Sequence, residues 1–292
     1  MKRIATGSIA VGTLVLAMKA AAWWLTGSAA LYSDALESVV NVVASVIALG
    51  ALTYASMPAD DNHPYGHEKV EFFSAAIEGA LIIVAAVSIL QHAWVSWRDP
   101  VHLEAPWLAL TLTVVSTAFN GAWAALLMRT GRTARSAAMV ADAKHLYSDV
   151  VTSLGILLGI GLVLLTGLHW LDPLLAAATA MHVLWSGLTV MRSSVAGLMD
   201  EAPDPATMER IRTLVNQHAA GAIEAHDLRT RHAGRFTYLE FHLVVPGAMR
   251  VDEAHEICDR VEGALRAEVE GLVVTIHVEP EGKAKHRGVL VL

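Results

Sequence analysis

The sequence predicts a multi-pass α-helical membrane protein, with six transmembrane helices followed by a C-terminal cytosolic domain of the pattern α-β-β-α-β. The first observation is composition: 54% of the 292 residues are hydrophobic and only 17% are charged, whereas about a quarter of the residues of a soluble domain are charged. The second is a series of six apolar segments. The third is a change after Met199, where Pro203 and Pro205 interrupt the apolar pattern and charged residues become frequent. We therefore expect a transmembrane domain over residues 1–201, a cytosolic domain over 202–282 and a tail over 283–292.

The six apolar segments each reach the length of about 20 residues that an α-helix needs to span a bilayer. They are residues 4–25, 30–57, 70–97, 105–128, 136–168 and 171–199. The first is too long to be the apolar region of a signal peptide, so we expect it to remain in place as a membrane helix.

The distribution of Lys and Arg predicts the orientation of these helices, because basic residues are enriched in cytoplasmic loops. With six spans, one side of the membrane carries Lys2, Arg3, Lys69, Arg129, Arg132 and Arg135, and the loops of the other side carry only Arg98. Both termini and the C-terminal domain are therefore expected in the cytoplasm, which fits an inner (plasma) membrane protein.

The C-terminal domain alternates between helix and strand patterns. Asp204 is suited to cap a helix that begins with Pro205 and runs to about residue 219. Asp252 is expected to cap a second helix that ends near Gly271. The expected strands are residues 225–231 and 236–245, joined by a turn at Gly234, and residues 272–279; the tail after residue 280 has no clear pattern.

Two of the apolar segments carry ionisable side chains well inside the predicted helix, where such residues are expensive and indicate function. In the second segment Glu37 and Asn41 are four residues apart, and in the fifth His145 and Asp149 have the same spacing. Each pair therefore shares one helix face.

The two pairs are expected at similar depth. At a rise of 1.5 Å per residue, Glu37 and Asn41 begin about 10–16 Å below the outer end of their helix, and His145 and Asp149 lie about 14–20 Å above the inner end of theirs. In a hydrocarbon core about 30 Å thick these positions meet. Two carboxylates, one imidazole nitrogen and one amide oxygen suit a divalent ion held by four ligands; the alternative is that these groups only pair with one another.

Composition excludes several other functions. The single cysteine, Cys258, excludes an intramolecular disulfide framework and a thiolate-rich metal site, and we expect it to pack in the core. The net charge of −7 does not indicate a nucleic-acid-binding protein, which would show a clustered basic surface.

Several motifs together resemble the cation diffusion facilitator family over nearly the whole chain. They are the run Ser33-Asp34-Ala35-Leu36-Glu37-Ser38-Val39-Val40-Asn41, the loop Asp60-Asp61-Asn62-His63-Pro64-Tyr65-Gly66-His67, the pair His145 and Asp149, and the run His226-Asp227-Leu228-Arg229-Thr230-Arg231. The resemblance implies a homodimer of six-helix subunits in a lipid membrane, each with a metallochaperone-like cytosolic domain, that exchanges cytoplasmic divalent metal for protons.

The resemblance also implies which residues form the sites. The transport site would consist of Glu37, Asn41, His145 and Asp149, the loop site of Asp60, His63 and His67, and the cytosolic regulatory site of His226, His242, His255, His277 and Glu279; Lys69 and Asp200 would form a charge pair between the membrane and cytosolic parts. Glu37 and Asn41 depart from the family's common zinc pattern, which has Asp or His followed four residues later by Asp. Glu279 replaces a more usual Asp. Each of these sites has an alternative interpretation. The loop could be only a polar turn, the cytosolic histidines could be exposed residues on a solvated sheet, and Lys69 and Asp200 could be two unrelated charges beside the membrane.

These observations predict a secondary transporter rather than an enzyme: an exporter of a divalent transition-metal cation, with Zn²⁺ as substrate and regulatory ligand, Cd²⁺ as a mimic, and protons as the counter-substrate. Efflux of Fe²⁺ or Mn²⁺ by the same mechanism is an alternative that the oxygen-rich ligand set favours. A membrane metal sensor without transport is a second, although it would need no ligands inside the membrane. An intramembrane metallo-hydrolase is a third, but its metal needs an open coordination position.

Overall fold

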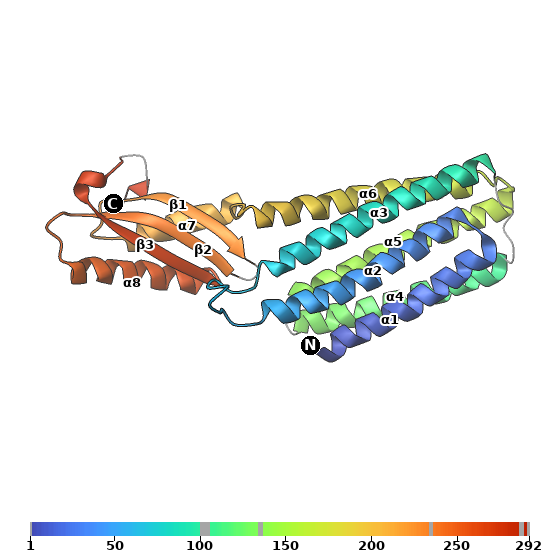
Figure 1. The fold of residues 1–292 in the computed structure, drawn as a ribbon, viewed down its shortest axis with the longest axis horizontal. Helices are drawn as coiled ribbons and strands as arrows, with labels where there is room; N and C mark the ends of the chain where they lie inside the picture. The colour runs from blue at the N-terminus through green and yellow to red at the C-terminus, as the bar shows by residue number, and fades with distance from the viewer. Residues whose placement is uncertain (1, 100–105, 134–136, 234–235, 286–288, 291–292) are drawn as a thin grey trace. The chain divides into compact units, whose positions relative to one another are not determined.

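The computed structural model describes residues 2–99, 106–133, 137–233, 236–285 and 289–290 (Figure 1). Within helices and strands, the side chains of residues 2–6, 106, 131–132, 137–142, 144–145, 148 and 289–290 lie outside this description. The chain divides into two compact units, one of Met1–Thr53 with Ser74–Arg192 and one of Tyr54–Phe73 with Ser193–Leu292. The turn expected at Gly234 lies outside the described residues.

Long apolar helices make up the first unit. They are α1 (Lys2–Thr26), α2 (Ala29–Ala55), α3 (Val70–Arg98), α4 (Pro106–Thr133), α5 (Ala137–Thr166) and α6 (Leu171–Leu198). The last residues of α2 and α6 and the first residues of α3 belong to the second unit. Among the described residues, six helices are long and apolar enough to cross a membrane. The prediction of six transmembrane helices is therefore confirmed, and their ends differ from the expected ones by only a few residues.

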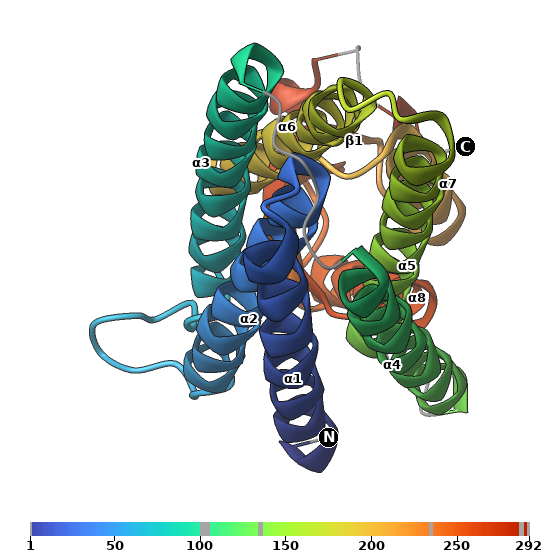
Figure 2. The ribbon, with the colours of Figure 1, turned by 90° about the vertical axis from the view of Figure 1, so that its right-hand side faces the viewer.

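Small residues allow the membrane helices to pack closely. Helix α4 packs against both α1 and α5 (Figure 2). Between α3 and α6, a Cβ atom added at Gly79 would lie 3.0 Å from the backbone nitrogen of Met191 and 3.2 Å from the carbonyl oxygen of Gly187. A larger residue at Gly79 would force these two helices apart, as expected where membrane helices associate through small residues.

A carboxylate from α6 caps the start of α2. Asp172 accepts hydrogen bonds from the backbone N–H groups of Ala29 and Ala30, at 2.7 and 3.3 Å, and from the hydroxyl of Ser28. A helix N-terminus leaves backbone N–H groups without intrahelical partners, and in a membrane such groups need an acceptor. Asp172 therefore fixes the helix that carries Glu37 and Asn41.

The second unit contains a sheet with the strand order β3-β2-β1-β4. Its elements are α7 (Pro205–His218), β1 (Glu224–Ala233), β2 (Phe236–Val245), α8 (Val251–Glu268), β3 (Leu272–Pro280), the 3-10 helix η1 (Glu281–Lys283) and β4 (Val289–Leu290). Strand β1 runs antiparallel to β2 and β4, and β2 runs parallel to β3. The predicted α-β-β-α-β order is confirmed, and β4 and η1 lie in the tail for which the sequence showed no pattern.

One predicted helix cap is right and the other is wrong. Asp204 accepts hydrogen bonds from the N–H groups of Ala206 and Thr207 and caps α7 as expected. Helix α8 instead begins after Arg250, whose backbone N–H is bound by the side chain of Glu253. Asp252 lies inside the first turn, and its carboxylate accepts from the guanidinium of Arg250.

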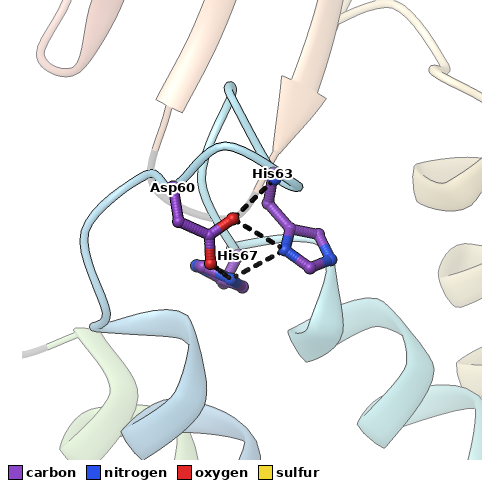
Figure 3. A group of neighbouring side chains, drawn as sticks. All are labelled: Asp60, His63 and His67. Carbon is purple, nitrogen blue, oxygen red and sulfur yellow. Dashed lines mark hydrogen bonds and ion pairs between the residues drawn. The ribbon is translucent and has the colours of Figure 1, made fainter.

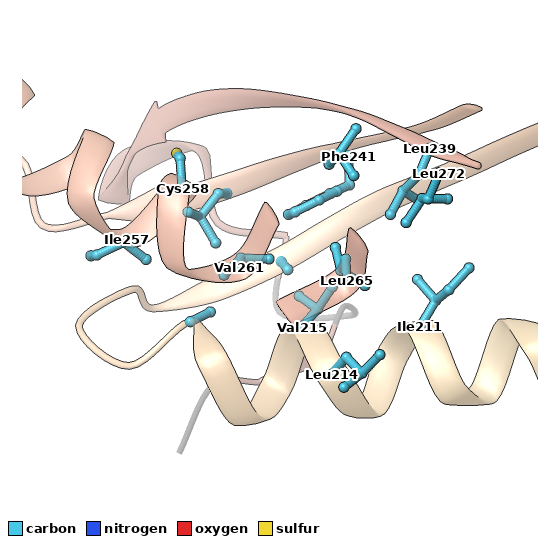
Figure 4. Packing of buried hydrophobic residues seen from close by; sticks show 14 of the residues in the cluster. Ile211, Leu214, Val215, Leu239, Phe241, Ile257, Cys258, Val261, Leu265 and Leu272 are labelled. Carbon is cyan, nitrogen blue, oxygen red and sulfur yellow. The ribbon is translucent and has the colours of Figure 1, made fainter. Parts of the chain in front are cut away.

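An apolar core joins α7 and α8 to one face of the sheet (Figure 4). Ile211 of α7, Val261 and Leu265 of α8, and Leu239 and Leu243 of β2 are all completely or nearly completely buried. Cys258 belongs to the same core, as predicted. Because side chains alternate along a strand, the even-numbered positions of β2 are left for the opposite face.

Candidate metal-binding sites

In the membrane unit, α2 and α5 bring Asn41 and Asp149 into contact. The amide nitrogen of Asn41 donates a hydrogen bond of 2.6 Å to a carboxylate oxygen of Asp149, which is 3% exposed. Glu37, Asn41 and Asp149 line one cavity of about 50 Å³, together with His182, Ser186 and four apolar side chains, Val40, Ile82, Ala85 and Val183. The cavity therefore presents two carboxylates and an amide between two antiparallel helices.

His145, the fourth predicted ligand, lies on α5 one turn before Asp149. Its side chain lies outside the described residues. Glu37, Asn41 and Asp149 offer the cavity oxygen atoms, which are the ligands of hard and borderline divalent ions.

A buried ion pair lies one helical turn from these ligands, and sequence reasoning did not assign it a role. The ammonium group of Lys19 on α1 is 2.7 Å from a carboxylate oxygen of Asp34 on α2, and the hydroxyl of Ser153 on α5 contacts both, at 3.0 and 2.8 Å. Each of the three side chains is at most 2% exposed. These contacts join α1, α2 and α5. Because Asp34 precedes Glu37 by three residues and Ser153 follows Asp149 by four, the ion pair lies about one helical turn from the cavity.

The loop between α2 and α3 gathers Asp60, His63 and His67 (Figure 3). Nε2 of His67 lies 3.1 Å from Nδ1 of His63 and 3.3 Å from a carboxylate oxygen of Asp60, whose other oxygen is 3.1 Å from Nδ1 of His63. A hydrogen bond from the backbone N–H of His63 lowers the pKa of the Asp60 carboxyl below its ordinary value. A charged carboxylate and two imidazole nitrogens thus point at one spot, an arrangement suited to zinc-like ions.

In the cytosolic sheet, three histidines form a row across neighbouring strands. His226 of β1 is paired with His242 of β2, which is paired with His277 of β3. Neighbouring imidazole rings are 5.3 and 5.0 Å apart. This row occupies the face of β2 opposite the apolar core, as the period-two alternation predicted.

Glu279 brings two members of the row into a potential metal site. Its carboxylate oxygens lie 3.4 Å from Nε2 of His226 and 3.3 Å from Nδ1 of His242, while Nε2 of His277 is more distant at 3.9 Å. Within the described part of this one chain, His255 does not join the group, because its imidazole is exposed and pairs with Asp259 at 3.7 Å.

Glu224 is a further residue of this site that sequence reasoning missed. Its carboxylate is completely buried and lies 3.2 Å from Nδ1 of His226. A carboxylate on one ring nitrogen fixes the tautomer and leaves the other nitrogen for a metal. The Glu224 carboxylate thus lies beside Nδ1 of His226, while Nε2 of the same ring lies beside Glu279. The strand alternation that located the other residues places Glu224 two positions before His226, on the same face of β1.

Contacts within the second unit connect the residues near the loop to the cytosolic domain. Lys69 and Asp200 form the expected pair, with the ammonium 2.8 Å from the carboxylate. The hydroxyl of Tyr238 donates to the carbonyl oxygen of Tyr65 in the loop, and the guanidinium of Arg231 lies over both rings, 4.6 and 4.7 Å from their centroids.

Comparison with known proteins matches both parts of the chain. Residues 5–199 match the family model described as the cation efflux transmembrane domain, and residues 203–281 match that of the cation efflux protein, cytoplasmic domain. The chain is 38% identical over 273 residues to an uncharacterized transporter of Synechocystis sp., covering 94% of this chain and 88% of that protein. It is 31% identical over 281 residues to the cation-efflux pump FieF of Escherichia coli, covering 96% and 93% respectively. A solved structure of CzrB in its zinc form is 52% identical and covers 30% of this chain and 98% of its own, with a TM-score of 0.28.

Proposed function

Because this chain belongs to the cation diffusion facilitators, the cation efflux family, and is a multi-pass membrane transporter of metal cations, we propose that it exports a divalent transition-metal ion, zinc first, in exchange for protons. The observation that carries the proposal is the cavity between α2 and α5, in which Glu37, Asn41 and Asp149 converge. Two carboxylates balance the charge of one divalent cation. With the imidazole of His145 they complete a four-ligand set, the coordination that zinc prefers.

Proton exchange follows from the chemistry of these ligands. Carboxylates and imidazoles bind a metal only in their deprotonated forms, so metal and protons compete for the same lone pairs. Metal enters from the cytoplasm, and protonation of the outward-facing site releases it. Helices α2 and α5 would tilt as a unit between the two states.

The loop group and the histidine row are assigned regulatory roles. In the proposed homodimer, zinc held by His226, His242, His277 and Glu279 draws two cytosolic domains together. Bound metal shifts the transport equilibrium only to the extent that it binds one conformation better than the other. His255 is proposed as an additional ligand of that site in the dimer. Both termini are proposed to face the cytoplasm.

The test is Asp149→Ala in purified full-length protein reconstituted into liposomes, with zinc uptake and internal pH followed together. We expect loss of coupled flux, because one of the two charged ligands is gone, whereas Glu209→Gln on the exposed face of α7 retains it. Normal flux in Asp149→Ala would remove the proposed site. Proton movement that does not depend on zinc would contradict the proposed exchange of zinc for protons.

A second candidate substrate is Fe²⁺ or Mn²⁺, favoured by the three oxygen donors of Glu37, Asn41 and Asp149. Competition among zinc, cadmium, manganese and iron in the same liposomes ranks the substrates. A sensor without transport would show no flux of any of these ions in the intact protein.

A further inference from the structure

Helix α6 supplies a third polar wall to the cavity between α2 and α5. His182, Val183 and Ser186 of α6 line it together with Glu37, Asn41 and Asp149. His182 and Ser186 are four residues apart, so both project from one face of α6. This is the same spacing as in the two pairs that define the proposed transport site.

The depth of His182 matches that of the carboxylates. Helices α2 and α6 both run inward from the outer side under the six-span topology. At 1.5 Å per residue, His182 lies about 16 Å from the start of α6 at Leu171, and Glu37 about 12 Å from the start of α2 at Ala29. Both positions fall in the middle of a core about 30 Å thick. An imidazole at that depth is costly unless it faces a polar cavity or a partner.

The cavity has room for more than a bare ion. Its volume of about 50 Å³ exceeds the ~30 Å³ that one water molecule occupies in the liquid. With Glu37, Asn41, Asp149 and the adjacent His145 counted as four ligands, His182 offers a fifth donor atom of the borderline type and Ser186 an additional oxygen. Five or six ligands suit Fe²⁺, Co²⁺ and Mn²⁺ better than a closed tetrahedral set does.

We propose that His182 is an additional nitrogen ligand of the transported cation, presented by α6 together with the hydroxyl of Ser186, and that it widens the substrate range to divalent ions with five or six ligands. This inference rests on the proposed transport site. The competing role for His182 is structural, through its ring contact with Trp185 at 6.4 Å between centroids.

The experiment uses full-length protein in which Asp60, His63 and His242 are replaced by alanine, so that the loop and cytosolic groups no longer bind. Co²⁺ is added as the probe, because its visible absorption strengthens as coordination falls from six to four. We expect His182→Ala to shift the spectrum toward four-coordination and to lower manganese and iron flux at least ~10-fold relative to zinc flux. His92→Ala is the matched control, since His92 is also an imidazole in a membrane helix but stacks on Tyr32 at 4.4 Å.

A ligand exchange keeps the proposal testable if His182→Ala folds poorly. With Cys258 replaced by alanine, His182→Cys places the chain's single thiol at the cavity and should give a cobalt–thiolate charge-transfer band. An unchanged cobalt spectrum in His182→Ala, equal loss of flux for all ions, or no thiolate band in His182→Cys would each overturn the inference. Asp149→Ala separates this from the proposed function: if Asp149→Ala still binds cobalt and transports zinc, the transport site itself is wrong.

Discussion

The two units of this protein use polar side chains in opposite ways. In the membrane unit, polar groups join the helices: Lys19, Asp34 and Ser153 are almost completely buried and contact one another across three helices. In the cytosolic unit, an apolar core around Phe241 and Leu265 holds the fold, and the row of His226, His242 and His277 lies on the other face of the sheet.

The difference reflects the solvent of each unit. Burial of apolar surface drives the folding of a domain in water, but lipid tails give membrane helices no such drive, so close packing and polar contacts must hold them together. Loss of a polar group that joins helices should therefore lower the stability of the membrane unit, whereas loss of a polar group on the histidine face of the sheet should lower only the metal affinity of the cytosolic unit.

Breaking the buried ion pair should have the largest effect. Lys19→Met leaves the carboxylate of Asp34 buried without its counter-charge, and we expect the free energy of unfolding to fall by about 3–5 kcal/mol. Denaturant titration of the protein in detergent micelles measures it. The double variant Lys19→Met with Asp34→Leu should recover most of the loss, because it removes both charges. A double variant no more stable than Lys19→Met would contradict a role based on pairing.

Glu224→Gln tests the cytosolic unit, where loss of a polar group should lower metal affinity. The variant removes the charge that orients His226, and zinc affinity of the histidine row should fall by about tenfold, the lower end of what loss of an outer carboxylate costs. Zinc is titrated against a chelator in full-length protein in which Asp60, His63 and Asp149 are alanine. Glu240→Gln, exposed on the same sheet, is the control and should leave affinity unchanged. Equal affinity in both variants would show that Glu224 does not position His226.

Asp172→Ala removes the cap of α2, and we expect it to cost about 0.5–2 kcal/mol of unfolding free energy, as loss of an N-cap acceptor does. Asp172→Asn should cost less, because the amide oxygen still accepts from the N–H groups of Ala29 and Ala30. Asp99→Ala, at an exposed position just after α3, serves as the reference. If Asp172→Ala matches Asp99→Ala, the cap contributes nothing.

The pair of Lys69 and Asp200 should matter least. Both side chains are more than a third exposed, and exposed ion pairs contribute about 0–1 kcal/mol. A double-mutant cycle with Lys69→Ala and Asp200→Asn measures the coupling; Asn is chosen because Asp200 has a φ of +59°, which Asn tolerates. A coupling well above 1 kcal/mol would mean that the pair acts as part of a larger network.

The sequence by itself determined the elements and the faces of the molecule. Apolar length specified the six membrane helices, because a bilayer of fixed thickness demands about 20 apolar residues per span. Period-two alternation placed His242 opposite Leu243, and spacing of four placed Glu37 with Asn41 on one helix face. These patterns are local, so one stretch of chain is enough to reveal them.

Only the tertiary structure decided which separate segments meet. The packing of α1 with α2 and α5 places Asp34 and Ser153 beside Lys19, and the packing of α6 places His182 at the cavity that holds Asp149. Glu224 became part of a metal site only through its contact with His226. Such contacts join residues that are distant along the chain, and no local period carries that information, because it is the packing of whole helices and strands that sets the distances.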